Sequence, residues 1–349
     1  VEALSKCCVD LDISVPVGKD SLSMRTKWDE GSVEHVVKSP LSGVITAMAP
    51  VADVQISITP ELNTKKSSKI IHATLNNNKR LAGSIFSEVS QSSYLDTPDV
   101  DDMTAFKEMF NAIQYLVAQN KILALHDVSD GGLAASLLEM AFTKKIGMDI
   151  LIKDLDAKDL NRYFFSEEIG LVLQVDDAHI DEVSSVLISA SSIVNIVGNI
   201  SASKEFTISN STDNFYKESI TVLEKHWREA SHAIQAIRDN QSIADSELEL
   251  LDDDNYTGLY SKESFDGANL KTFHISKTKP KVAVLREQGV NGQMEMAAAF
   301  TLAGFEAVDV HMQDLLDNKV NLKDFNGLAA CGGFSYGDVL GAGGGWSKT

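Results

Sequence analysis

The stretch with the clearest chemical potential runs from His126 to Leu133 and reads His-Asp-Val-Ser-Asp-Gly-Gly-Leu. Ser129 or Asp130 could cap a following helix, and Gly131 and Gly132 would let a ligand approach the backbone. The start of a helix attracts phosphate, and the Asp127 carboxylate could hold the accompanying Mg²⁺. The alternative is a well-capped helix in an α/β fold with no ligand, because capping signals are common.

This stretch needs a strand before it and a helix after it. The apolar run 122–125 predicts a buried strand, and apolar residues recur at helical spacing over 133–142. Further strands and helices alternate over about 65–210, which predicts an α+β or α/β domain. An amphipathic helix over 219–238 and an acidic stretch then predict a linker.

A second polar stretch, Gly18-Lys19-Asp20-Ser21, follows a short predicted strand at 13–17. It is not a phosphate-binding P-loop, since Asp20 interrupts the motif and the upstream glycine is missing. Lys19 could still contact a phosphate, although a plain polar turn is an equal alternative. Another strand is expected over 43–49, so the first 60 residues are predicted to be strand-rich.

The carboxylates of Glu167 and Glu168 precede a predicted strand over 170–175. Adjacent strand residues point to opposite sides, so both cannot serve one acid–base site, and an exposed pair at a strand end is the simpler interpretation. The histidines are scattered, and each is expected to be structural. His126 is the exception, because it lies at the mouth of the proposed phosphate site.

A glycine-rich turn follows a third strand of a predicted parallel, doubly wound sheet that begins at Lys281. Backbone N–H groups of Gly332, Gly333, Phe334 and Ser335 could form an oxyanion hole. Cys331 has small neighbours but no visible histidine partner, so we expect a buried cysteine rather than a nucleophile. The glycine run 341–345 follows a helix-like stretch, which argues against a dinucleotide fingerprint.

The composition excludes several classes of function. The chain has 349 residues and a formal net charge of −19, which argues against a broad nucleic-acid surface. No apolar run reaches the ~20 residues of a membrane span, and no signal peptide is visible. Three cysteines without metal-binding spacing suit a reducing cytosol, so we expect a cytoplasmic protein. Neither end has the pattern of a natural terminus, which predicts an internal piece of a longer chain.

Several of these stretches together resemble the phosphoribosylformylglycinamidine synthase family in its long, single-chain form. The likeness covers nearly the whole sequence in the right order, and the set is far more specific than any one motif. The stretches that carry it are 15–24, 126–133, 280–291, 295–300 and 330–342.

The resemblance implies a fold and a domain order. The expected fold class is α/β and α+β, with the end of an aminoimidazole ribonucleotide synthetase-like module followed by the start of a flavodoxin-like class I glutaminase domain. Residues 1–60 would end the N-terminal subdomain of the second synthetase-like module, and 61–210 would form its C-terminal α+β subdomain. A helix and acidic linker would occupy 211–279, and a truncated amidotransferase domain 280–349.

The resemblance also implies an activity: ATP- and glutamine-dependent amidation of formylglycinamide ribonucleotide in purine biosynthesis. Asp127 would match the Mg²⁺ ligand and Ser129 a nucleotide contact, with Asp130, Gly131, Gly132 and Lys19 beside the bound ATP or ADP. This second-half site is thought to be auxiliary in the family. The residues from Gly332 to Ser335 would match the glutaminase oxyanion loop.

The glutaminase Cys, His and Glu are expected beyond Thr349, in the missing C-terminal part of the same polypeptide, and the first synthetase module before Val1. The expected partners are therefore those missing parts and the small-molecule substrates, without nucleic acid or membrane, and the fragment alone is expected to be inactive. One alternative is a non-catalytic nucleotide-binding or scaffolding piece. Another is a stand-alone relative such as a selenophosphate synthetase-like enzyme, which the start of a glutaminase at 280–342 argues against.

Overall fold

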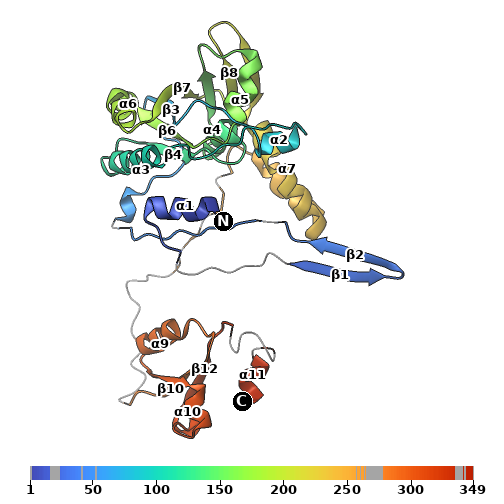
Figure 1. Ribbon diagram of the computed structural model, residues 1–349, viewed down its shortest axis with the longest axis vertical. Helices are drawn as coiled ribbons and strands as arrows, with labels where there is room; N and C mark the ends of the chain where they lie inside the picture. The colour runs from blue at the N-terminus through green and yellow to red at the C-terminus, as the bar shows by residue number, and fades with distance from the viewer. Residues whose placement is uncertain are drawn as a thin grey trace. The chain divides into compact units, whose positions relative to one another are not determined.

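A computed structural model gives the fold of two compact units, Val1–Thr257 and Gly258–Thr349 (Figure 1). The boundary between them lies inside the stretch predicted as a linker. The residues that the structure describes are 2–15, 24–40, 42–51, 53–256, 258–259, 261–262, 264, 278–334, 341 and 343–348. Among these residues, no helix is long and apolar enough to cross a membrane.

A mixed seven-stranded sheet in the order β4-β6-β3-β7-β5-β8-β9 is the centre of the first unit. All neighbours pair antiparallel except β5 and β8, which pair parallel. The strands predicted over 122–125 and 170–175 are confirmed as β4 and β6, with β4 starting and ending two residues later than predicted. The strands are β3 (Ser68–Thr74), β4 (Ala124–Asp127), β5 (Gly147–Leu151), β6 (Gly170–Asp176), β7 (Ile193–Ser201), β8 (Glu205–Ser209) and β9 (Asn214–Ser219).

Helices cover both faces of this sheet (Figure 1). Ile70 on β3 packs with α4 (Gly132–Phe142), α5 (Leu160–Phe165) and the start of α7 (Ile220–Arg238). The next residue, Ile71, packs with α3 (Met103–Ala118) and α6 (Ile180–Ser189). Because side chains alternate along a strand, a two-sided core requires apolar residues at consecutive positions, which is why β3 carries Ile70-Ile71 and β6 carries Leu171-Val172-Leu173.

The predicted linker contains more regular structure than its sequence pattern indicated. The helix expected over 219–238 is confirmed as α7, but the strand β9 precedes it, and α8 (Gln241–Glu249) and a 3₁₀ turn, η4 (Leu250–Asp252), follow it. Asn240 caps α8 by accepting hydrogen bonds from Ser242 and Ile243 N–H groups. Three of the six acidic residues over 245–254 therefore lie on this capped helix, and the other three follow it.

The first 60 residues differ from prediction. The described part contains α1 (Glu2–Leu11), an antiparallel hairpin of β1 (Arg25–Glu30) and β2 (Val33–Lys38), and a 3₁₀ turn, η1 (Val54–Ile56). The strand predicted over 43–49 is wrong, since these residues form no ladder, and the described part of 13–17 is not a strand either. The apolar side chains of Val44 and Met48 remain exposed.

The second unit is a three-stranded parallel sheet in the order β11-β10-β12, as the sequence predicted. Its strands are β10 (Lys281–Arg286), β11 (Glu306–His311) and β12 (Gly327–Ala330), and its helices are α9 (Gln293–Leu302), α10 (Met312–Leu316) and α11 (Gly343–Lys348). Ala283, Leu285, Val310 and Met312 form its buried core. The glycine run that was discounted as a fingerprint enters α11.

Short helical pieces complete the fold. These are α2 (Ile85–Val89), η2 (Ala157–Asp159), η3 (Asp177–His179) and η6 (Leu322–Asp324).

Candidate functional site

At the end of β4, the side chains of His126 and Asp127 lie on opposite faces of the sheet. His126 pairs with Val172 and therefore faces α4, whereas Asp127 pairs with Leu171 and faces the other way. The Asp127 side chain is 70% exposed, so its carboxylate is accessible to a cation. Its backbone oxygen accepts a hydrogen bond from Ser136 Oγ at 2.8 Å, which joins this strand end to α4.

The His126 ring is held by an acceptor at each nitrogen. Its Nε2 lies 3.0 Å from Glu139 Oε2, and its Nδ1 lies 2.7 Å from the Asp127 backbone oxygen and 3.4 Å from Asp127 Oδ1. Both contacts are hydrogen bonds only when both ring nitrogens carry a proton. His126 therefore holds the end of β4 in place through its contacts with the Asp127 backbone oxygen and with Glu139.

The helix α4 begins differently from prediction. Its N-cap is Gly131 in the left-handed conformation, which has no side chain to cap the helix, so the expected capping by Ser129 or Asp130 is wrong. A carboxylate from another element takes that role: Glu167 Oε1 accepts hydrogen bonds from the Gly131 N–H at 2.9 Å and the Ile85 N–H at 3.0 Å. One carboxylate thus satisfies backbone donors at the starts of α4 and α2.

Gly132 is a glycine because the protein itself approaches it closely. Its φ is +67°, and a Cβ would lie 2.7 Å from the Phe164 backbone oxygen and 2.8 Å from the Ser166 backbone oxygen. The space beside Gly132 is therefore filled by the end of α5 rather than left for a ligand.

The neighbouring carboxylate, Glu168, is buried, so the prediction of an exposed pair at a strand end is wrong. Arg80 Nε donates to Glu168 Oε1 at 2.6 Å and Arg80 Nη2 to Glu168 Oε2 at 2.8 Å, and Asp101 accepts from the same guanidinium. Burial raises the pKa of Glu168, but hydrogen bonds from Arg80 and Asn76 outweigh it and hold that pKa below its usual range. Glu167 and Glu168 contact different groups, so they do not share one site, as expected.

One further polar group near the motif was not anticipated. The Nδ1 atom of His72, on β3, is buried and has no hydrogen-bond partner. Its Nε2 lies 3.0 Å from where a Cβ on Gly170 would stand, next to Val128. Burial, with a smaller contribution from the charge of Lys79, lowers the pKa of His72 to about 4, so the ring is neutral.

The donor set at Asp127 suits a hard cation that takes few protein ligands. Within the described part of the chain, no three His, Cys, Asp or Glu side chains gather into a metal-binding group. Mg²⁺ usually keeps several waters and binds through one or two carboxylates plus substrate phosphates, so one accessible carboxylate is compatible with it. The predicted contacts Lys19 and Ser335 lie outside the described residues.

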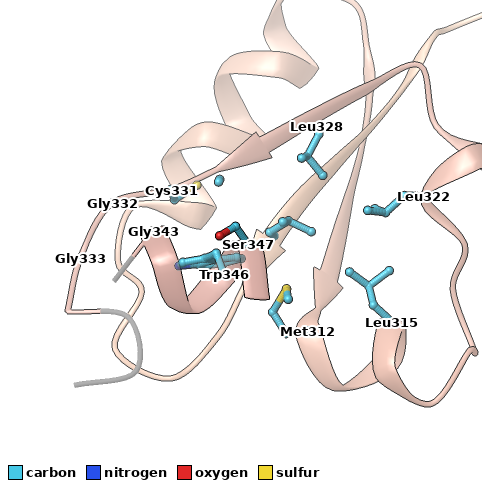
Figure 2. Close-up of a pocket in the computed structure, with 12 residues that line it drawn as sticks. Met312, Leu315, Leu322, Leu328, Cys331, Gly332, Gly333, Gly343, Trp346 and Ser347 are labelled. Atoms are coloured by element: carbon cyan, nitrogen blue, oxygen red, sulfur yellow. The ribbon is translucent and has the colours of Figure 1, made fainter. Parts of the chain in front are cut away.

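The second unit holds a pocket of about 500 Å³ beside the glycine turn after β12 (Figure 2). Cys331, Gly332 and Gly333 line one part of it, and Met312 and Trp346 another. The turn is fixed by a hydrogen bond from the Asn291 N–H to the Gly332 oxygen at 3.2 Å. At Gly333, φ is +135° and a Cβ would lie 2.6 Å from the Gly289 oxygen, so glycine is required there.

Cys331 is buried, as predicted, and burial raises the pKa of its thiol, with a smaller contribution from Glu295. A raised pKa lowers the fraction of reactive thiolate, which supports a structural rather than nucleophilic cysteine. Phe334, the last described residue of the turn, is exposed.

Three known protein families match consecutive parts of the chain. Residues 1–50 match the FGAR-AT PurM_N-like domain, 68–209 the C-terminal domain of AIR synthase related proteins, and 279–349 the CobB/CobQ-like glutamine amidotransferase domain. The third of these confirms the glutamine amidotransferase start that the sequence predicted.

Among solved structures, similar chains include T. maritima PurL complexed with ATP (10% identity, TM-score 0.39, covering 49% of this chain and 27% of that one). T. maritima PurL complexed with FGAR gives 10% identity and a TM-score of 0.40, covering 49% and 30%. E. coli HypE gives 18% identity and a TM-score of 0.31, covering 46% and 51%. The chain thus aligns with less than a third of each PurL chain.

Proposed function

The chain belongs to the phosphoribosylformylglycinamidine synthase family, because it carries in order that family's PurM_N-like, AIR synthase-type and glutamine amidotransferase domains, and we propose its function from that premise. The whole enzyme would convert formylglycinamide ribonucleotide, ATP and glutamine to formylglycinamidine ribonucleotide, ADP, phosphate and glutamate. The single observation that carries this proposal is the order of the three domains on one chain.

In the proposed reaction, the amide oxygen of the substrate takes the γ-phosphoryl group of ATP and becomes a leaving group. Ammonia then adds at the amide carbon and expels phosphate, which leaves the amidine. Ammonia would come from glutamine by attack of a cysteine thiolate, with the resulting oxyanion stabilised by backbone N–H groups of the turn from Gly332 to Ser335.

The role proposed for the Asp127 site is binding of Mg²⁺ and ATP or ADP. Asp127 would supply a carboxylate to Mg²⁺, and Ser129, Asp130, Gly131 and Lys19 would surround the nucleotide, whereas Gly132 is packed against the end of α5. When bound, Mg²⁺ would neutralise phosphate charge. Within this site, Glu167 already accepts the Gly131 N–H, so a phosphate oxygen that used this donor would have to displace the carboxylate.

Isothermal calorimetry of the chain with MgADP tests this role. We expect Asp127→Asn to weaken MgADP binding about tenfold, since a charge-assisted metal contact is lost, and to leave magnesium-free ADP binding unchanged. Asp156→Asn is the matched control, because that carboxylate is similarly exposed, at 68%, and pairs only with Lys158. Equal MgADP affinities of the Asp127 variant and the unmodified chain would contradict the assignment of Asp127.

A second candidate is a non-catalytic nucleotide-binding piece. The observation that favours it is the buried Cys331 with its raised pKa, which provides no reactive thiol at the described part of the glycine turn. Incubation of the chain with formylglycinamide ribonucleotide, MgATP and ammonium chloride separates the candidates. Release of ADP that depends on the ribonucleotide would support catalysis by the chain, whereas nucleotide binding without turnover would support the binding role.

A further inference from the structure

The side chain of Glu139, on α4, joins two elements that are distant in the sequence. Its Oε2 lies 3.0 Å from His126 Nε2 on β4, and its Oε1 accepts a hydrogen bond from the Trp227 indole Nε1–H on α7, also at 3.0 Å. The carboxylate is half-buried, which strengthens both contacts relative to water. Oε1 therefore has the Trp227 N–H as its donor, and Oε2 accepts from His126 when Nε2 carries a proton.

Helix α7 begins beyond the segment that matches the AIR synthase-type domain, which ends at residue 209. Its first half is anchored to the sheet unit: Ile220 is buried, and the Trp227 ring lies 5.8 Å from that of Phe142 on α4. Ile234 and Ile237 in its second half are exposed, at 64% and 88%. Trp227 is thus the last large apolar side chain that ties α7 to α4.

From Glu139, the contacts continue through His126 to the proposed ligand site at Asp127. His126 Nδ1 lies 2.7 Å from the Asp127 oxygen, and its rigid ring spans the distance from there to Glu139. A shift of the Asp127 backbone must therefore move the ring or break a hydrogen bond. The contacts Asp127–His126–Glu139–Trp227 form one continuous path from the strand end to α7.

We infer that Glu139 is a positioning residue that couples ligand occupancy at Asp127 to helix α7 through Trp227. This inference rests on the proposed binding of Mg-nucleotide at Asp127. It adds a function for α7. The position of α7, in the part of the chain that precedes the amidotransferase domain, would depend on whether nucleotide is bound. Because coupling is reciprocal, a change at Trp227 must also alter nucleotide affinity.

Glutamine is the informative replacement, since it has the same shape but only one acceptor oxygen. In Glu139→Gln, the single amide oxygen can accept from Trp227 while the NH₂ group can face only an unprotonated His126 Nε2, so the charge-assisted contact of the path is lost without a change in volume. Glu229→Gln on α7 is the matched control, because Glu229 is 76% exposed and pairs only with His226.

The experiment is ¹⁹F NMR of the full chain labelled with 5-fluorotryptophan, titrated with MgADP and paired with calorimetry on the same samples. The chain has three tryptophans, and Trp227→Phe assigns the resonance of interest. We expect MgADP to shift the Trp227 resonance in the unmodified chain and in Glu229→Gln. In Glu139→Gln, the shift at saturation should disappear and MgADP affinity should fall about fivefold.

The outcomes separate the inference from the function on which it rests. If calorimetry detects no MgADP binding to the unmodified chain, the proposed nucleotide site fails, and the coupling fails with it. If MgADP binds but the Trp227 resonance stays fixed, or shifts equally in Glu139→Gln, the site stands and the coupling is refuted. A purely structural Glu139 would lower the melting temperature but would leave the ligand-induced shift intact.

Discussion

Gly132→Ala is the sharpest test of how the nucleotide-site motif is built. An alanine at a φ of +67° costs about 1–2 kcal/mol, because its Cβ crowds the following carbonyl. The new Cβ would also lie 2.7 Å and 2.8 Å from the backbone oxygens of Phe164 and Ser166, which cannot move without shifting α5. Overpacking of this kind costs about 1–3 kcal/mol. We therefore expect the free energy of unfolding to fall by about 2–5 kcal/mol.

Gly83→Ala is the matched control, since Gly83 has a φ of +77° but no atom within 4 Å of the Cβ position. It should lose only the conformational part, about 1–2 kcal/mol. Urea unfolding of the full chain, followed by Trp227 fluorescence with Trp28 and Trp346 replaced by phenylalanine, measures the first unit. Equal losses in the two alanine variants would show that α5 does not constrain Gly132, and the packing argument would be wrong.

Two other predictions follow from buried groups. Because the pKa of His72 is lowered from 6.5 to about 4, the unfolded chain binds a proton that the folded chain excludes, so this residue should cost about 3 kcal/mol of stability as the pH falls from about 6.5 to 4. His72→Phe should flatten that part of the pH dependence in urea titrations, and an unchanged slope would contradict the burial of the ring. At Cys331, burial and a raised pKa predict slow modification by Ellman's reagent, while the partly exposed Cys7 and Cys8 react quickly. Three equally fast thiols in the native chain would contradict this.

Local patterns predicted most of the elements of the two units. Continuous apolar runs predicted β6 and β10, and helical spacing predicted α4 and α7 within one or two residues. These signals are local, because burial on one or both faces imposes a fixed period on nearby residues. The hairpin of β8 and β9 was missed, although the polar turn 210–213 between them carries a usable turn signal.

The amphipathic pattern predicted which elements exist better than which side chains they bury. Phe110 lies one helical turn before the buried Ile113 on α3, yet its side chain is 54% exposed, while the smaller Ala105 and Ala112 are buried. A helix facing a sheet at close range accepts small residues at the contact, and the sequence does not contain the distance between them.

The sequence by itself determined that a strand leads into His126 and Asp127, that a helix begins at or just after the two glycines, and that the domains follow in the order of one enzyme family. Only the tertiary structure decided what surrounds that helix start. Glu167, 36 residues away, accepts the Gly131 N–H, α5 fills the space beside Gly132, and Glu139 joins His126 to Trp227, 88 residues from Glu139. Such contacts depend on strand order and helix placement, which arise from long-range packing rather than from the spacing of neighbouring residues.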